Sequence, residues 1–249
     1  MPIKLGSRRF EPRPFTTLVT LGLLVLLVSL GRWQLRRADE KQRLYDAFAA
    51  GTDTSTEIVG TTPTLPRFRH VEAAGHYDPA RQVLIDNMAD SDGRAGYFVI
   101  TPFALASGGW LLVNRGWIPW GATRAERPDL AVGAGARRIQ GRIDQLPSPG
   151  LRMGRPAPLS PPFPVVATFP TRADLGVLLH ESTWASAGDV VLLDAADADG
   201  YRRHWVPPGM APMRHTAYAV QWFGLAAALL VIYVLTNLSK PTGPRESVP

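Results

Sequence analysis

Two long apolar runs constrain the fold of this chain more than any other feature. They cover Phe15 to Leu30 and Ala217 to Leu235, and neither contains a charged residue or a proline. An α-helix rises about 1.5 Å per residue, so roughly twenty such residues cross the hydrocarbon core of a bilayer. The pattern predicts a membrane protein that is anchored near both ends, with one soluble domain between the anchors.

The boundaries of these parts follow from where helix formers, prolines and glycines lie. We expect an N-terminal tail over 1–14, a first transmembrane helix over 15–33 and a second over 214–238, with a tail at 239–249. From Arg32 to Ala50 the chain has no glycine or proline and is rich in helix formers, so the first helix should continue as a rigid stalk to about residue 50. The domain between the anchors is then residues 51–213.

The orientation of the chain rests on its N-terminal charges, because basic residues mark the cytoplasmic side of a span. The basic residues before the first run are Lys4, Arg8, Arg9 and Arg13, and they outnumber the single acidic Glu11. Two spans return the C-terminus to the same side, so both termini are expected in the cytoplasm and the domain outside it. A cleaved secretory signal is the alternative for the first run, but Leu30 to Trp33 offers no small-residue cleavage site, which favours a retained anchor.

Composition excludes several classes of function. The chain has no cysteine, which rules out disulfides, thiolate metal sites and thiol catalysis. The net charge is +6, but many of the basic residues flank the two runs, which is typical of topology and lipid-headgroup signals rather than of nucleic-acid binding. The common sequence signatures of hydrolases, zinc proteases and nucleotide-binding enzymes are absent from the sequence, so we expect a protein that is not an enzyme.

The segment between the anchors is predicted to be rich in β-strands. Short runs of β-branched and aromatic residues alternate with turn residues, and they occupy 67–77, 82–86, 96–105, 110–117, 137–144, 165–169 and 190–193. Such a series favours an antiparallel, barrel-like domain and an α+β membrane protein overall. One short helix is expected over 171–180, where Thr171 and Asp174 resemble a capping box. The proline-rich segment 147–164 is expected to form a long loop.

The second apolar run has two distinct faces when it is drawn as a helix. His215, Tyr218 and Trp222 fall within one stripe at its outer end. Gly224 and Ala228 lie on the opposite face, and their four-residue spacing is typical of a surface that packs on another helix. If the first helix packs there, the stripe that contains His215 points away from it.

This stripe allows two interpretations. In the first it is an interfacial aromatic belt with a histidine and needs no function. In the second, His215 is an axial ligand of a haem, Tyr218 and Trp222 offer flat apolar walls, and arginines bind the haem propionates. Trp33 and Arg36, at the outer end of the first helix, lie at a similar depth if the two helices are antiparallel.

Three stretches resemble the surfeit locus protein 1 family of cytochrome c oxidase assembly factors. They are Gly31 to Arg36 with Lys41, Leu112 to Pro119, and Arg214-His215 with Tyr218-Ala219 and Gln221 to Phe223. Gly96 ahead of Thr101-Pro102 also fits, and the arrangement of two spans around one domain matches over the whole chain.

This resemblance implies a role in the maturation of haem–copper oxidase. It implies that the protein binds haem a through His215, with Tyr218, Trp222, Trp33 and Arg36 beside it, and helps to insert the haem into the catalytic subunit. The expected partners are that subunit, other assembly factors and membrane lipid. The mitochondrial targeting segment of the family is missing, so a bacterial inner membrane with a periplasmic domain is expected.

Two questions remain open at the level of sequence. The motif residues Asn114, Arg115, Gly116 and Trp117 are expected either to form a structural turn at a strand end or to contact a partner. The protein is expected either to bind haem or to act as a cofactor-free membrane scaffold that stabilises an oxidase assembly intermediate.

Overall fold

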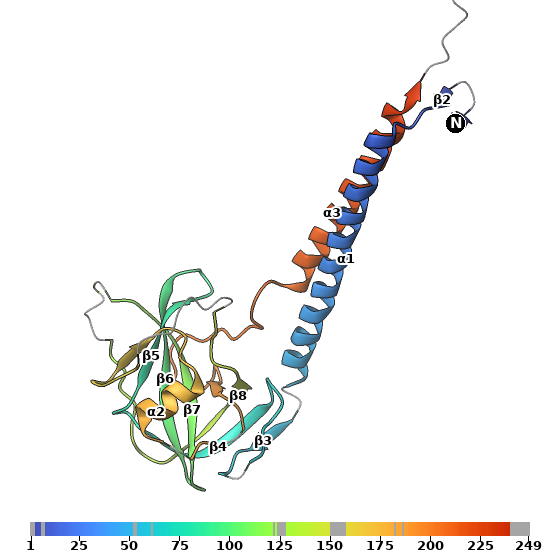
Figure 1. Cartoon of the computed structure of the whole chain (residues 1–249). Helices are drawn as coiled ribbons and strands as arrows, with labels where there is room; N and C mark the ends of the chain where they lie inside the picture. The colour runs from blue at the N-terminus through green and yellow to red at the C-terminus, as the bar shows by residue number, and fades with distance from the viewer. Residues whose placement is uncertain are drawn as a thin grey trace, which may run out of the picture. The chain divides into compact units, whose positions relative to one another are not determined.

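The computed structural model describes residues 3–5, 8–51, 54–60, 62–121, 123, 128–149, 158–181, 183–185 and 187–239 (Figure 1). The chain divides into two compact units, one of residues 1–45 and 208–249 and one of residues 46–207. The first unit holds helix α3 (Pro212–Thr236), most of helix α1 (Pro14–Ala50) and three short strands, β1 (Ile3–Leu5), β2 (Arg8–Phe10) and β11 (Leu238–Ser239). The second unit holds helix α2 (Arg172–Leu179) and the strands β3 (Ser55–Glu57), β4 (His70–Tyr77), β5 (Val83–Ala89), β6 (Ala95–Leu105), β7 (Trp110–Pro119), β8 (Arg137–Asp144), β9 (Val165–Ala167) and β10 (Val190–Leu193).

Helices α1 and α3 are the two predicted spans. Helix α1 is continuous from Pro14 to Ala50, so the first apolar run and the residues of the predicted stalk belong to one helix. Helix α3 starts two residues earlier than predicted, because Pro212 occupies the first turn, where a proline is tolerated. Only 11% of each apolar window is buried, so neither helix is the core helix of a soluble domain. The chain is therefore a membrane protein.

The two helices run side by side and present regular seams to each other (Figure 1). Along α1, buried and half-buried positions that recur at alternating intervals of three and four residues are Thr17, Thr20, Leu24, Leu27, Gly31, Gln34 and Ala38, with Leu30 half-buried beside them. Along α3 the same alternation gives His215, Ala219, Trp222, Ala226, Leu229 and Tyr233, with Phe223 half-buried beside them. This spacing is typical of two helices packed as a coiled coil.

The ends of the chain beside the helices pair with each other. Strand β2 pairs antiparallel with β1 and with β11, so residues 8–10 lie next to residues 238–239. The sequence predicted tails here and no strands. Most of the predicted tail 239–249 lies outside the described residues, as does 150–157 of the proline-rich loop.

The second unit is a β-barrel with extra strands at its rim. The sheet order is β3-β4-β8-β10-β7-β6-β5-β9, and an additional pairing of β4 with β6 closes a ring of β4, β8, β10, β7 and β6. The predicted barrel-like domain is confirmed, but its sheet is mixed. Strand β10 runs parallel to β7, β3 parallel to β4, and β9 parallel to β5. Strand β10 enters beside β7 after the long connection that contains α2, and a long connection permits a parallel neighbour.

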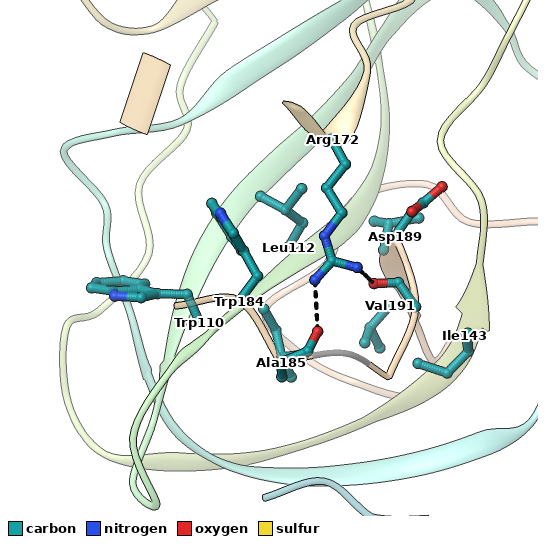
Figure 2. A pocket seen from close by; sticks show the side chains of 11 residues that line it. Trp110, Leu112, Ile143, Arg172, Trp184, Ala185, Asp189 and Val191 are labelled. Carbon is teal, nitrogen blue, oxygen red and sulfur yellow. Dashed lines mark hydrogen bonds between the residues drawn. The ribbon is translucent and has the colours of Figure 1, made fainter. Parts of the chain in front are cut away.

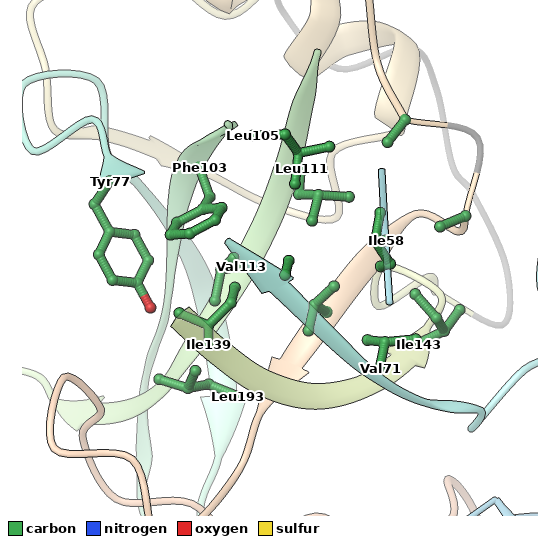
Figure 3. Close-up of a cluster of buried hydrophobic side chains, with 14 residues drawn as sticks. Ile58, Val71, Tyr77, Phe103, Leu105, Leu111, Val113, Ile139, Ile143 and Leu193 are labelled. Atoms are coloured by element: carbon green, nitrogen blue, oxygen red, sulfur yellow. The ribbon is translucent and has the colours of Figure 1, made fainter. Parts of the chain in front are cut away.

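The interior of the ring is filled by apolar side chains from all sides (Figure 3). Tyr77 and Phe103 meet edge to face with ring centroids 5.1 Å apart, and Val113 and Leu193 are fully buried beside them. Burial of each such side chain stabilises the fold by about 1.5–3 kcal/mol. The barrel is a packed core and not a ligand cavity.

Helix α2 covers a second apolar cluster and begins with the predicted capping box. The Thr171 hydroxyl accepts from the amide of Asp174, and the Asp174 carboxylate accepts from the amide of Thr171. Arg172 ties the helix to the segment after it by donating to the carbonyls of Ala185 and Gly188 at 2.7 and 2.6 Å. Figure 2 shows this guanidinium among the side chains of a small hollow, which leaves no space for a water molecule.

Candidate functional site

His215 lies in the first turn of α3 and contacts α1. Its Nδ1 atom is 2.8 Å from Oε1 of Gln34, and both side chains are half-buried. Within the described part of the chain, the Nε2 atom of His215 makes no hydrogen bond. The imidazole ring is therefore held by a hydrogen bond at Nδ1, and Nε2 is available to bind a ligand.

The expectation that the stripe of His215 points away from the first helix is wrong. Gly224 and Ala228 are exposed, and a side chain at Gly224 would meet nothing within 4 Å. The helices pack instead through the large ring of Phe223 on α3, which lies against Gly31 on α1, where there is no side chain. A Cβ atom at Gly31 would lie 2.6 Å from the ring of Phe223, so any side chain at position 31 requires this ring or its helix to move.

A second polar contact joins the same two helices at their other ends. The hydroxyls of Thr17 and Tyr233 are 2.6 Å apart. The helix from Thr17 to Gln34 and the helix from His215 to Tyr233 are both about 26 Å long at the α-helical rise. The two polar contacts therefore agree on one antiparallel register, and their separation is close to the hydrocarbon thickness of about 30 Å. The contact of His215 and the contact of Tyr233 therefore lie at opposite ends of the apolar part of the helix pair.

The other predicted haem neighbours are distributed unevenly around His215. Trp33 and Tyr218 are 46% and 45% exposed, so both rings present an open face. Trp33 comes one residue before Gln34, and Tyr218 comes three residues after His215. In two antiparallel helices that meet at Gln34 and His215, residues with these sequence offsets lie on the same side of the helix pair, so Trp33 and Tyr218 share one flank. Trp222 is half-buried in the seam, and Arg36 is exposed on α1 away from it.

The motif Asn114 to Trp117 forms a bulge in β7. Phe98 pairs with Trp117 and Ile100 pairs with Asn114, so two residues of β7 lie opposite one residue of β6. Gly116 adopts φ +117°, which only glycine takes readily, and a Cβ there would lie 2.8 Å from the carbonyl oxygen of Arg202. The Asn114 side chain closes the bulge by accepting from the amide of Gly116 at 3.0 Å.

The bulge directs Arg115 into the interior of the domain, where its side chain bridges several strands and loops. It is only 2% exposed, and it donates to the side chain of Gln82 and to the carbonyls of Leu130, Ala131 and Asp199. The same Gln82 oxygen accepts from Thr101 of β6 at 2.9 Å. The motif is therefore buried and has a structural role. It was expected either to form a structural turn or to contact a partner, and this geometry supports the structural turn.

Trp117, the last residue of the motif, is covered by two arginines that share one carboxylate. Its indole donates to the carbonyl of Met88 at 2.9 Å, and the guanidinium groups of Arg94 and Arg202 lie 5.9 and 5.5 Å from its ring centre. Both arginines bind Asp90. Burial would raise the pKa of Asp90, but hydrogen bonds from Arg94, the Asp92 amide and Arg202 outweigh it and lower this pKa from 3.8 to about 2.

This lowered pKa predicts an acid-sensitive step in stability. The contribution of ionised Asp90 is fully present above the unfolded-state pKa near 3.8, and it is lost as pH falls toward about 2. Urea unfolding of the full-length protein between pH 5 and 2 should show this decline. Asp90→Asn should be less stable at pH 7 and lack the decline, whereas Asp92→Asn, whose carboxylate is 65% exposed, should retain it. An unchanged decline in Asp90→Asn would contradict the assignment.

The described residues hold no cluster of three or more histidine, aspartate or glutamate side chains that could bind a metal ion. Of the other histidines, His70 pairs with Asp194 at 2.7 Å, and His76 is exposed on β4. An open hollow of about 330 Å³ is lined mainly by proline, alanine and other apolar residues around Gln82. A more open hollow of about 680 Å³ lies beside α2 and is lined by Arg172, His180, Glu181 and Trp184 among others. The predicted ligand residue His215 belongs to neither hollow and lies instead on the helix pair.

A comparison with known protein families identifies the chain. The model of the SURF1 family matches residues 21–227, which include α1 from residue 21 onward, the whole barrel and α3 as far as residue 227. The chain belongs to the SURF1 family. The SURF1 family comprises cytochrome oxidase assembly factors and is not known as a family of enzymes.

Individual relatives agree with the family assignment. A SURF1-like protein of Rickettsia felis is 28% identical over 88% of this chain and 96% of its own length. One from Rickettsia bellii is 27% identical over 88% of this chain, and one from Monosiga brevicollis is 23% identical over 86%. The covered shares show that the similarity to these relatives extends over most of the chain.

Sequence reasoning missed Gln34 as the partner of His215. It also missed Phe223 as the residue that fills the notch at Gly31. Both lie inside the stretches that carry the SURF1 resemblance, but neither was read as part of a helix–helix seam. The alternating three- and four-residue spacing, continued from the first apolar run through Gly31, could have found Gln34. Phe223 lies next to the corresponding series in the second run, and that spacing does not single it out.

Proposed function

We propose that this SURF1 protein binds haem a at the outer face of the membrane and assists its insertion into the catalytic subunit of haem–copper oxidase. The observation that carries the proposal is His215, whose Nε2 makes no hydrogen bond within the described residues. This ring lies at the membrane surface, and the exposed Trp33 and Tyr218 flank it. A neutral imidazole nitrogen is the usual protein ligand of haem iron, and the donor set fits this group.

The surroundings of His215 suit an amphipathic macrocycle. Its apolar faces would contact Trp33, Tyr218 and lipid, and its propionates would meet the exposed Arg36 and Arg214 near the headgroups. When bound, haem a would supply an iron centre that is destined for the oxidase. A site on the flank of the pair is open laterally, which suits transfer to a partner subunit and to other assembly factors in the same membrane.

The test is haem retention by the full-length protein purified in detergent from cells that make haem a. Wild type should carry haem with a Soret band, and His215→Ala should lose at least about tenfold in occupancy, because the substitution removes the proposed iron ligand. His76→Ala, which removes an exposed histidine of the barrel, is the matched control. Equal haem in His215→Ala and wild type would disprove the ligand assignment. Oxidase subunits captured without any Soret band would favour the cofactor-free scaffold.

We also propose that both termini face the cytoplasm of a bacterial cell and that the barrel is periplasmic. The pairing of β2 with β11 supports a common side for the two termini. The basic residues before α1 support the cytoplasm as that side. A C-terminal fusion to a reporter that is active only in the periplasm should stay inactive, and an active fusion would reverse the orientation.

A further inference from the structure

The contact between His215 and Gln34 favours one of the two neutral tautomers of the imidazole ring. The atom of Gln34 that faces His215 is the amide oxygen Oε1, at 2.8 Å from Nδ1. A carbonyl oxygen can only accept a hydrogen bond, so Nδ1–H must donate. The lone pair of the neutral imidazole is then on Nε2, which is the nitrogen that is open for a ligand.

We propose that Gln34 is a positioning residue for metal ligation by His215. It selects the Nδ1–H tautomer, orients the ring and strengthens the donation of Nε2 to a haem iron. The proposal rests on the haem-binding function that is proposed above. Histidine ligands commonly donate their second N–H to a carbonyl or carboxylate, and loss of that partner costs about 10- to 100-fold in metal affinity.

The packing of the two helices explains why this hydrogen bond is well defined. Gln34 lies one turn beyond Gly31, and Phe223 fills the notch at Gly31. The register of the pair is fixed a second time by Thr17 and Tyr233. On the outer side of Gln34, Lys41 donates to the carbonyl of Pro208 at 3.0 Å, just before α3 begins. The hydrogen bond thus lies between contacts on both sides along the two helices, which hold Gln34 and His215 in register.

The first test reads the tautomer without haem. Full-length protein labelled with ¹⁵N-histidine is purified from cells that make no haem a and reconstituted in lipid vesicles. The resonances of His215 are identified by their loss in His215→Ala. Nitrogen shifts should show the Nδ1–H tautomer in wild type and a return to the Nε2–H tautomer, which free histidine prefers, in Gln34→Leu. Nε2–H in wild type would overturn the proposal regardless of whether the protein binds haem.

The second test reads the ligand in the haem-loaded protein. Gln34→Leu removes the acceptor, so haem affinity should fall about 10- to 100-fold, the reduction potential should rise and the iron–histidine stretching frequency should fall. Gln34→Glu supplies a stronger acceptor and should shift the potential and the frequency in the opposite directions. Opposite shifts from two substitutions at one position are not expected from a loss of packing.

A matched variant separates positioning from general loosening of the helix pair. Thr17→Val breaks the other interhelical hydrogen bond and should leave the potential and the stretching frequency of the haem unchanged. If His215→Ala loses haem but both Gln34 variants keep the wild-type potential and frequency, the positioning role fails and the proposed function stands. If His215→Ala keeps its haem, the proposed function itself fails.

Discussion

Arg115→Ala is expected to destabilise the barrel by roughly 3–5 kcal/mol, a large part of the stability of an ordinary domain. The guanidinium of Arg115 serves four acceptors, of which the closest is the carbonyl of Asp199 at 2.7 Å. It also lies 4.8 Å from the ring centre of Tyr201. Its removal leaves buried acceptors without a donor, at about 1–3 kcal/mol for each one that water cannot reach.

Denaturant unfolding of the full-length protein, followed by far-ultraviolet circular dichroism, measures this loss. The stability of Arg115→Lys should lie between that of Arg115→Ala and that of wild type. One ammonium group cannot donate to all the acceptors that surround the planar guanidinium. Arg138→Ala is the control, since this arginine lies in β8 with a side chain that is 59% exposed and pairs only with surface carboxylates. It should change stability by less than about 1 kcal/mol. A loss of stability in Arg115→Ala that is as small as that in Arg138→Ala would refute the structural role of the motif.

Gly31→Leu is expected to separate the two membrane helices. A Cβ at Gly31 already lies 2.6 Å from Phe223, and a leucine adds three further carbons at the point of closest approach. Overpacking of this kind costs about 1–3 kcal/mol where the surroundings can relax. Here relaxation means moving α3 away from α1, which also breaks the contact between His215 and Gln34. Haem retention should therefore fall with the opening of the pair.

The same helix provides a matched control for this substitution. Gly22 lies in the same span, and an added Cβ there meets nothing within 4 Å, so Gly22→Leu should leave the pair closed. The chain has no cysteine, so nitroxide labels on Leu26→Cys and Leu225→Cys report the interhelical distance without background. Gly31→Leu should broaden and lengthen the spin–spin distance distribution. Identical distributions in the Gly31→Leu and Gly22→Leu proteins would contradict the packing.

A compensating change tests the cause. Phe223→Ala removes the ring that occupies the notch, so it should restore the distance when it is combined with Gly31→Leu. The effects of the two substitutions should therefore be strongly non-additive, as is expected of residues in direct contact.

Local features of the fold were predictable because neighbouring residues determine them. The bounds of β8 and β10 agree with the predicted strands at both ends, and the capping box of α2 rests on two residues three positions apart. The continuity of α1 follows from an uninterrupted run of helix formers. The parallel placement of β10 beside β7 and the closure of the ring by β4 and β6 depend on contacts between distant segments, which strand patterns do not specify.

The candidate site was only partly predictable for a related reason. His215 stood out because it opens an apolar run, and the family resemblance pointed to the same residue. The packing face was mistaken because Gly224 and Ala228 satisfy a pattern for close helix approach, whereas the helices fit a large ring of one into a notch of the other. Such a fit depends on the register of two segments almost 200 residues apart. The sequence of either segment alone carries no information about that register.

The two polar contacts at opposite ends of the helix pair have a consequence for membranes of different thickness. Helices that were held only by apolar side chains could slide past each other to match a thinner or thicker bilayer. A pair that is fixed at Thr17–Tyr233 and again at Gln34–His215 cannot slide without breaking one of these hydrogen bonds. Hydrophobic mismatch is then absorbed by tilt of the pair as a unit or by deformation of the surrounding lipid. The geometry around His215 is thereby insulated from the lipid composition of the membrane.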